Sequence, residues 1–194
     1  MAATKTYTAT LHAIAQIAGS LRPECFSHFD GLPDVLSRAV DDALAGRRRF
    51  DRLADAGFVT VLGRGLHYST ARETALKLRE LSGIPAEGLS PPDLLHGPVA
   101  ALTPSVALWI VGDEPGPRLF AELRERAGVS VAVSADPELL HQADIPVPLP
   151  PGLPSWAAPI VAIAPAQAAG LRLAEVRHVP VDHPHGLSKV TLTR

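Results

Sequence analysis

Five short apolar runs, rich in β-branched residues, alternate with helical patterns over most of this 194-residue chain. The helical patterns cover 70–82, 117–127 and 156–176, and the apolar runs cover 58–62, 84–89, 106–111, 129–133 and 145–149. Such alternation is typical of a parallel sheet with helices on both faces, because each helix returns the chain to the edge where the next parallel strand begins. We therefore predict an α/β, doubly wound domain with right-handed crossovers. Pro159 and Pro165 remove backbone donors, so they should kink the last helix or confine Pro159 to its first turn.

Two further helices are predicted before the first strand, over 4–21 and 32–45. Apolar residues recur every three or four positions along the first of them, at Tyr7, Leu11, Ile14, Ala18 and Leu21. We divide the chain into an N-terminal helical extension, 1–56, and the α/β domain, 57–194, which closes with an extended tail. Because these helices carry apolar faces that one small sheet cannot cover, we expect a homodimer.

The composition excludes several classes of function. Hydrophobic residues make up 46% of the chain, which is enough to form a core, and the net charge of -2 gives no field that would attract nucleic acid or an anionic membrane. No apolar run is long enough to cross a bilayer. The single cysteine, Cys25, cannot form an internal disulfide, so we predict a protein of the reducing cytoplasm.

Three charged residues share one face of the predicted helix 70–82. Glu73 lies four positions before Lys77, and Glu80 lies three positions after it. On a solvated face this pattern is a stripe of weak ion pairs. In a cleft, the same carboxylates beside an ammonium group could exchange a proton with a carbon acid. Thr70 and Glu73 also have the spacing of a capping box, which would begin the helix at this threonine.

Other polar residues lie in predicted turns. His96 precedes a glycine and a proline, where it could cap the turn or serve as a positioned acid or base. The tract Gly63-Arg64-Gly65 allows a tight turn after a strand, but it lacks the third glycine and the acidic residue of a dinucleotide site. His183 and His185 could face the same way in the tail, yet no partner stands at metal-ligand spacing, so we predict no metal site.

Together these tracts resemble the sugar isomerase (SIS) domain family. More narrowly, the chain is similar to the second SIS domain of glucosamine-fructose-6-phosphate aminotransferases and to SIS-type glucosamine-6-phosphate deaminases. The resemblance covers nearly the whole chain. It rests on Gly63-Arg64-Gly65, the helix Ala71 to Glu80, Ala86-Glu87, His96-Gly97-Pro98 and the tail Leu187-Ser188-Lys189.

The resemblance implies a five-stranded parallel sheet and an aldose–ketose type of proton transfer without a cofactor. Glu80 matches the base that moves a proton between C1 and C2, and Lys77 beside it would stabilise the enediol-like charge. His96 matches the residue that helps to open the sugar ring, which this family supplies across a dimer interface. Lys189 matches the tail lysine that contacts the carbonyl of the open-chain sugar. The remaining substrate contacts would come from Arg64, Glu87, Ala2 and Ser188.

The sequence departs from the family in one large respect. The phosphate loop of the family, a Ser-x-Ser-Gly-x-Thr tract, belongs to the first SIS domain, and nothing here matches it. Residues 2–6 resemble the segment that closes that first domain. A glutaminase domain with an N-terminal cysteine is also missing, so glutamine-dependent amidotransfer cannot occur within these residues. We therefore expect the first SIS domain to be supplied upstream or in trans.

Two functional hypotheses follow. The first is the C-terminal SIS half of a sugar-phosphate isomerase, deaminase or aminotransferase, which is incomplete alone and acts on a substrate such as glucosamine 6-phosphate or fructose 6-phosphate. The second is a non-catalytic module that binds carbohydrate derivatives or mediates dimerisation. The sequence leaves open which sugar phosphate is used and in which direction the reaction runs.

Overall fold

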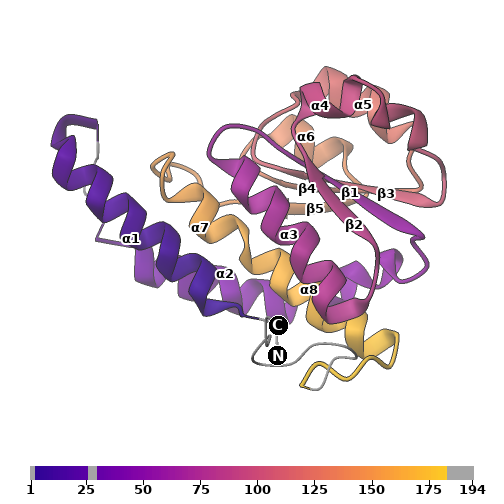
Figure 1. Cartoon of the computed structure of the whole chain (residues 1–194), viewed down its shortest axis with the longest axis horizontal. Coiled ribbons are helices and arrows are strands. Elements are labelled where there is room, and N and C mark those ends of the chain that lie inside the picture. The colour runs from indigo at the N-terminus through magenta and orange to yellow at the C-terminus, as the bar shows by residue number, and fades with distance from the viewer. Residues whose placement is uncertain (1–2, 26–29, 183–194) are drawn as a thin grey trace, which may run out of the picture.

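The computed structural model describes residues 3–25 and 30–182 of the chain. Its centre is a five-stranded, wholly parallel sheet with the strand order β2-β1-β3-β4-β5 (Figure 1). The strands are β1 (Phe58–Gly63), β2 (Ala86–Leu89), β3 (Val106–Val111), β4 (Val129–Ser134) and β5 (Ile145–Pro148). The predicted doubly wound α/β domain is confirmed, and the second strand begins later than its apolar run because Ile84 and Pro85 precede the ladder.

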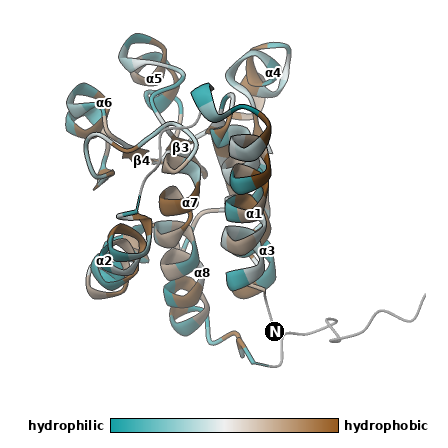
Figure 2. Cartoon of the chain, turned by 90° about the vertical axis from the view of Figure 1, so that its left-hand side faces the viewer, coloured by the Kyte–Doolittle hydropathy of each residue, from teal (hydrophilic) through white to brown (hydrophobic). Residues whose placement is uncertain are grey.

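Helices cover both faces of the sheet and bury a separate apolar core on each. Adjacent strand residues point to opposite faces, so Val61 joins one core and Leu62 joins the other. Figure 2 shows the two groups of helices on either side of β3 and β4. The first core contains residues of α3 (His67–Ser82), α7 (Ala158–Ala162) and α8 (Ala164–Val176), and the second contains residues of α4 (Pro91–Leu95), α5 (Pro117–Arg124) and α6 (Pro137–Gln142).

Helix α3 begins at His67, before the position that the sequence pattern suggested. The predicted capping box is therefore wrong. Thr70 lies inside the helix, fully buried, and its hydroxyl donates a hydrogen bond of 3.3 Å to the Pro159 carbonyl of α7. Gly83 ends the helix with a left-handed φ of 70°, which glycine adopts without strain. A partner from a distant helix thus replaced the local cap for this threonine.

The final helical pattern is interrupted, as its two prolines predicted. α7 ends at Ala162 and α8 begins at Ala164, so that Pro159 and Pro165 each lie in a first helical turn. There the missing backbone donor would have no intrahelical partner in any case. α8 packs closely on α3 at Gly170, which has no Cβ. A Cβ there would lie 2.8 Å from Leu81 Cδ1 and 3.3 Å from the Lys77 carbonyl oxygen.

The two predicted N-terminal helices are present as α1 (Lys5–Leu21) and α2 (Leu32–Ala45). The remaining short helices are η1 (Pro23–Cys25), η2 (Arg47–Leu53) and η3 (Pro98–Ala101). Tyr7 and Leu11 in the first half of α1 pack against the core that α3 shares. The second half projects from the body (Figure 1), and its outer face exposes Ile14, Ile17 and Leu21 by 56%, 61% and 75%. Among the described helices, none is both long and apolar enough to cross a membrane.

Candidate active site

Glu73, Lys77 and Glu80 form one charged cluster along α3. The Lys77 ammonium Nζ lies 2.5 Å from Glu80 Oε2 and 3.4 Å from Glu73 Oε1. Only 2% of the Lys77 side chain is exposed, against 15% for Glu73 and 26% for Glu80. The interpretation as a solvated stripe is therefore wrong for the lysine. A buried ammonium group is costly unless it is paired, and here a carboxylate lies on each side of it along the helix.

Helix α1 holds its first turns over this region of α3. The Tyr7 hydroxyl is 3.0 Å from Thr70 Oγ1 and 3.3 Å from Ser69 Oγ. Burial raises the pKa of the Tyr7 phenol above its ordinary value, and the negative charge of Glu73 acts in the same direction. The Gln167 side chain of α8 donates to the Thr4 carbonyl at 3.2 Å. The charged cluster is thus flanked by α1 and α8, neither of which is near it in sequence.

A hollow of about 290 Å³ adjoins the C-terminal end of α3. Leu81, next to Glu80 in the chain, lines it together with Thr4 of the N-terminal segment and Asp182 at the end of the described chain. The sites of Ala2, Ser188 and Lys189 lie outside the described residues. The described segments that lead to those residues therefore converge beside the charged cluster.

His96 does not join the cluster within one chain. It follows α4, on the opposite side of the sheet, where Leu94 is buried in the second core. His96 is exposed, and Gly97 behind it has a φ of 152°, a conformation that favours glycine. The glycine thus fixes the direction in which the chain leaves the histidine. The predicted catalytic residues therefore divide between the two faces, with Lys77 and Glu80 on one and His96 on the other.

The other described candidates lie at the surface. Arg64 follows β1 and pairs with Glu114 at 3.7 Å, with both side chains more than half exposed. Glu87 is exposed on the edge strand β2. Within the described ranges, no group of three or more His, Cys, Asp or Glu side chains could hold a metal ion. His183 and His185 of the tail lie outside those ranges.

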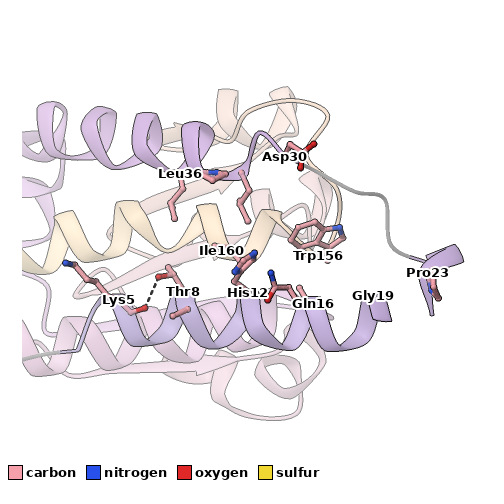
Figure 3. A pocket seen from close by; sticks show the side chains of 14 residues that line it. Lys5, Thr8, His12, Gln16, Gly19, Pro23, Asp30, Leu36, Trp156 and Ile160 are labelled. Carbon is pink, nitrogen blue, oxygen red and sulfur yellow. Dashed lines mark hydrogen bonds between the residues drawn. The ribbon is translucent and has the colours of Figure 1, made fainter. Parts of the chain in front are cut away.

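A hollow of about 890 Å³ lies elsewhere, between α1 and α2 (Figure 3). Its polar side chains point from one face of α1, and its other walls are mainly apolar. They comprise Lys5, Thr8, His12 and Gln16 against Leu32, Leu36, Trp156 and Ile160. None of the described residues predicted for the site lines this groove. No residue of α3 lines this groove, so the buried charges of α3 lie outside it.

Two residues that shape the charged cluster have no clear functional signal in the sequence. Tyr7 belongs to an apolar stripe, and Gly170 lies inside a helical pattern. The one available signal for the tyrosine was its hydroxyl, since a buried tyrosine usually finds a hydrogen-bond partner. Nothing in the sequence around Gly170 indicates that α8 approaches Lys77 there.

Known proteins resemble this chain over nearly its whole length. No protein-family model matches the chain. Glutamine–fructose-6-phosphate aminotransferase (isomerizing) of Pyrococcus horikoshii is 32% identical over 203 residues, which cover 97% of this chain and 33% of that enzyme. The corresponding enzyme of Methanothermobacter thermautotrophicus is 30% identical over 198 residues, with the same coverage of 97% and 33%. The chain thus spans about a third of the length of the curated relatives that it matches.

Solved structures share the fold. Glucosamine-6-phosphate deaminase from Thermotoga maritima superposes with a TM-score of 0.76 at 22% identity, over 97% of this chain and 56% of that one. The C-terminal domain of glucosamine-fructose-6-phosphate aminotransferase from Francisella tularensis gives a TM-score of 0.68 at 24% identity, over 78% and 44% of the two chains. The aligned sequences and the shared fold show that this chain is a sugar isomerase (SIS) domain that resembles the C-terminal SIS domain of glucosamine-fructose-6-phosphate aminotransferase.

Proposed function

We propose that this chain supplies the acid–base half of a sugar-phosphate isomerase, deaminase or aminotransferase site, and that a first SIS domain, upstream or in trans, supplies the phosphate-binding half. The observation that carries the proposal is the burial of Lys77 between Glu73 and Glu80. An ion pair that served only solubility would gain nothing from being withdrawn from water. The relatives and fold neighbours are named for fructose 6-phosphate and glucosamine 6-phosphate, which supports these two compounds as substrates.

In the proposed mechanism, Glu80 takes a proton from the carbon beside the carbonyl of the open-chain sugar and returns it to the neighbouring carbon. The Lys77 ammonium, 2.5 Å from this carboxylate, stabilises the negative charge that develops on the enediol oxygen. Glu73, at 3.4 Å on the other side of Lys77, is a positioning residue that holds the ammonium group in place. No net oxidation or reduction takes place.

The tail lysine is within reach of this site. Asp182 borders the hollow next to Glu80, and seven extended residues from there to Lys189 span at most about 25 Å. Lys189 would contact the sugar carbonyl, with Ser188 and Ala2 among the substrate contacts. Glu87 and Arg64 are assigned to substrate binding on the resemblance alone.

His96 would act on a site in a second copy of the chain. Its exposed position on the face opposite α3 supports this, because the sheet lies between His96 and Glu80 within one chain. We therefore propose a homodimer in the cytoplasm. The exposed apolar half of α1 supports the presence of further protein against this helix, whether a second copy or a preceding SIS domain.

Solvent exchange at the sugar carbons tests the proposal. The chain, mixed with a separately produced first SIS domain, is incubated with fructose 6-phosphate in D₂O, and the deuterium incorporated at C1 is followed by NMR. Glu80→Gln should reduce the exchange rate at least about 100-fold. Glu122→Gln on the exposed face of α5 serves as the matched control and should leave the rate unchanged.

Exchange by Glu80→Gln at the rate of the unmodified pair would remove Glu80 as the base. Binding of fructose 6-phosphate with no exchange by any variant would favour the non-catalytic module instead.

A further inference from the structure

A third hollow, of about 390 Å³, lies at the carboxyl edge of the sheet. The chain leaves β1 into α3 on one face of the sheet and leaves β3 into α5 on the other, so the connections that follow these two neighbouring strands diverge here. In open α/β sheets this crevice is the usual position of a ligand. The volume falls within the range of small-molecule pockets. His67, which lines the hollow, is ten residues or about 15 Å along α3 from Lys77, so this hollow is distinct from the charged cluster.

His67 brings an unsatisfied polar atom to this hollow. Its Nδ1 is buried without a hydrogen-bond partner among the described residues. Burial lowers the pKa of the imidazole and the charge of Asp113 opposes this effect, so the ring is neutral at neutral pH. A neutral imidazole offers one donor and one acceptor. A buried polar atom without a partner costs free energy, which a ligand hydroxyl can recover.

Gly112 makes room for this ring. It follows β3 with a φ of +86°, and a Cβ at this position would lie 2.6 Å from His67 Cδ2. Any larger residue would therefore displace the imidazole. The close approach fixes the ring against the backbone at the end of β3.

Asp113 presents a fixed carboxylate beside the ring. The Ser134 hydroxyl donates to its Oδ1 at 2.7 Å, and the Ala135 backbone N–H donates to the same oxygen at 3.3 Å. Both bonds converge on Oδ1, and neither uses Oδ2. Asp113 is exposed and lines the hollow together with the Ser155 side chain.

The charges disfavour a phosphate ligand here. Among the described residues, the lining includes the carboxylate of Asp113 but no lysine or arginine. Arg64, the nearby cation at this edge, pairs with Glu114 and is not part of the lining. A carboxylate, a neutral imidazole and a hydroxyl together recognise hydroxyl groups, while Leu66, Leu149 and Leu153 offer an apolar wall.

We propose that this hollow is a second ligand site, which binds a small unphosphorylated polyol through Asp113, His67 and Ser155. The site is independent of the proposed proton transfer on α3. A ligand hydroxyl donates to Asp113 Oδ2, and a second hydroxyl pairs with the His67 ring. The apolar wall covers the carbon skeleton.

Calorimetric titration of the whole chain tests this site, with glucose, glucosamine, glucose 6-phosphate and ethanolamine as the probes. Glucose and glucosamine should bind, and glucose 6-phosphate should bind at least about tenfold more weakly because its phosphate meets Asp113. Asp113→Asn should weaken glucose binding about tenfold, since it replaces a charged hydrogen-bond acceptor by a weaker neutral one. Glu114→Gln, at the same edge but outside the lining, is the matched control and should bind as the unmodified chain does.

Several results would overturn the proposal. One is the absence of binding by either sugar up to about 50 mM, a concentration that corresponds to less than 2 kcal/mol of affinity. The others are tighter binding of glucose 6-phosphate than of glucose, and ethanolamine binding equal to that of glucosamine. Glucose binding by Asp113→Asn equal to that of the unmodified chain would also overturn it. The Glu80→Gln chain should keep the polyol affinity unchanged, so a failure of this site and a failure of the proposed function are distinguishable. A thermal melt of each variant checks that it is folded.

Discussion

The ammonium group of Lys77 lies 2.5 Å from Glu80 Oε2, one helical turn away on α3, in a position where only 2% of the lysine side chain meets solvent. The spacing along α3 brings the two side chains together, and elements distant in sequence shield the pair from solvent. α8 approaches so closely that Gly170 has no space for a Cβ, and α1 lies across the neighbouring turn through Tyr7. The same residues at the same spacing on an exposed helix would be an ordinary surface pair.

Replacement of Lys77 by methionine tests how much this enclosure matters for stability. Methionine keeps most of the volume but leaves Glu73 and Glu80 facing one another without a cation. We expect the free energy of unfolding to fall by about 1–3 kcal/mol, less than for a fully buried pair because both carboxylates retain some solvent. Urea unfolding followed by circular dichroism measures the change.

The control is Arg118→Met on α5, where Arg118 pairs with Glu122 at 3.5 Å but is 96% exposed. This variant should change the free energy of unfolding by no more than about 0.5 kcal/mol. Equal effects of the two substitutions would mean that burial does not increase the contribution of the α3 pair to the free energy of unfolding.

Tyr7 gives the chain a pH-dependent stability in the alkaline range. Burial raises the folded-state pKa of its phenol above the ordinary value of 10.0. The folded protein then holds this proton more tightly than the unfolded chain does. Stability is therefore constant below about pH 10 and falls as the pH rises through the folded pKa.

The Tyr7→Phe variant should lose this alkaline decline, because it has no phenol to ionise. At pH 7 it should be destabilised by about 0.5–1.5 kcal/mol through loss of the hydrogen bonds to Thr70 and Ser69. Urea midpoints measured from pH 7 to 11 provide both quantities. Parallel curves for the two proteins above pH 10 would show that Tyr7 is not the group responsible.

The strands and most helices could be predicted because their signals are local. The apolar run at Val106–Val111 is buried along its whole length, as a central parallel strand requires, and Pro165 marks where the last helix restarts. The start of α3 could not be placed, since Thr70 has the residue type of a helix cap but hydrogen-bonds to Pro159, which is distant in sequence. At this position a tertiary hydrogen bond takes the place of the helix cap that the residue type favours.

The candidate site could be predicted only in part. The spacing of Glu73, Lys77 and Glu80 predicts that they share one helix face, but the solvent exposure of that face depends on α1 and α8. Periodicity gives no information on which surface two helices share. His67 gave no signal at all, because its role depends on the strand end at Gly112, which it meets only after the sheet has formed.

His67 should titrate below its ordinary value. Burial lowers its folded-state pKa from 6.5, and the charge of Asp113 partly offsets this. The unfolded chain therefore binds a proton on this histidine at a higher pH than the folded protein does. Stability that is present above about pH 6.5 is lost as the pH falls toward the folded pKa.

Histidine NMR signals measured from pH 8 to 5 follow this titration directly. Asp113→Asn should move the His67 midpoint further down, since it removes the charge that favours the imidazolium. Glu114→Gln at the same edge should move it less, because Glu114 is not among the groups that act on His67. A midpoint at or above 6.5 in the unmodified chain would contradict the burial of the ring.

The outer half of α1 should mediate association. Ile14, Ile17 and Leu21 continue the stripe that begins with Tyr7 and Leu11, yet more than half of each is exposed. Ile17→Glu should weaken self-association, or association with a first SIS domain, about tenfold or more, because a charge would replace a side chain that is buried in the complex. Sedimentation velocity at micromolar concentration measures both kinds of association.

Gln16→Glu is the matched control, since Gln16 lies on the same helix but faces the groove toward α2. The thermal midpoint of an isolated chain should stay the same in both variants, as neither side chain contributes to the core. A chain that sediments as a monomer without any partner would remove the expected homodimer, and unchanged association by Ile17→Glu would place the interface on another surface.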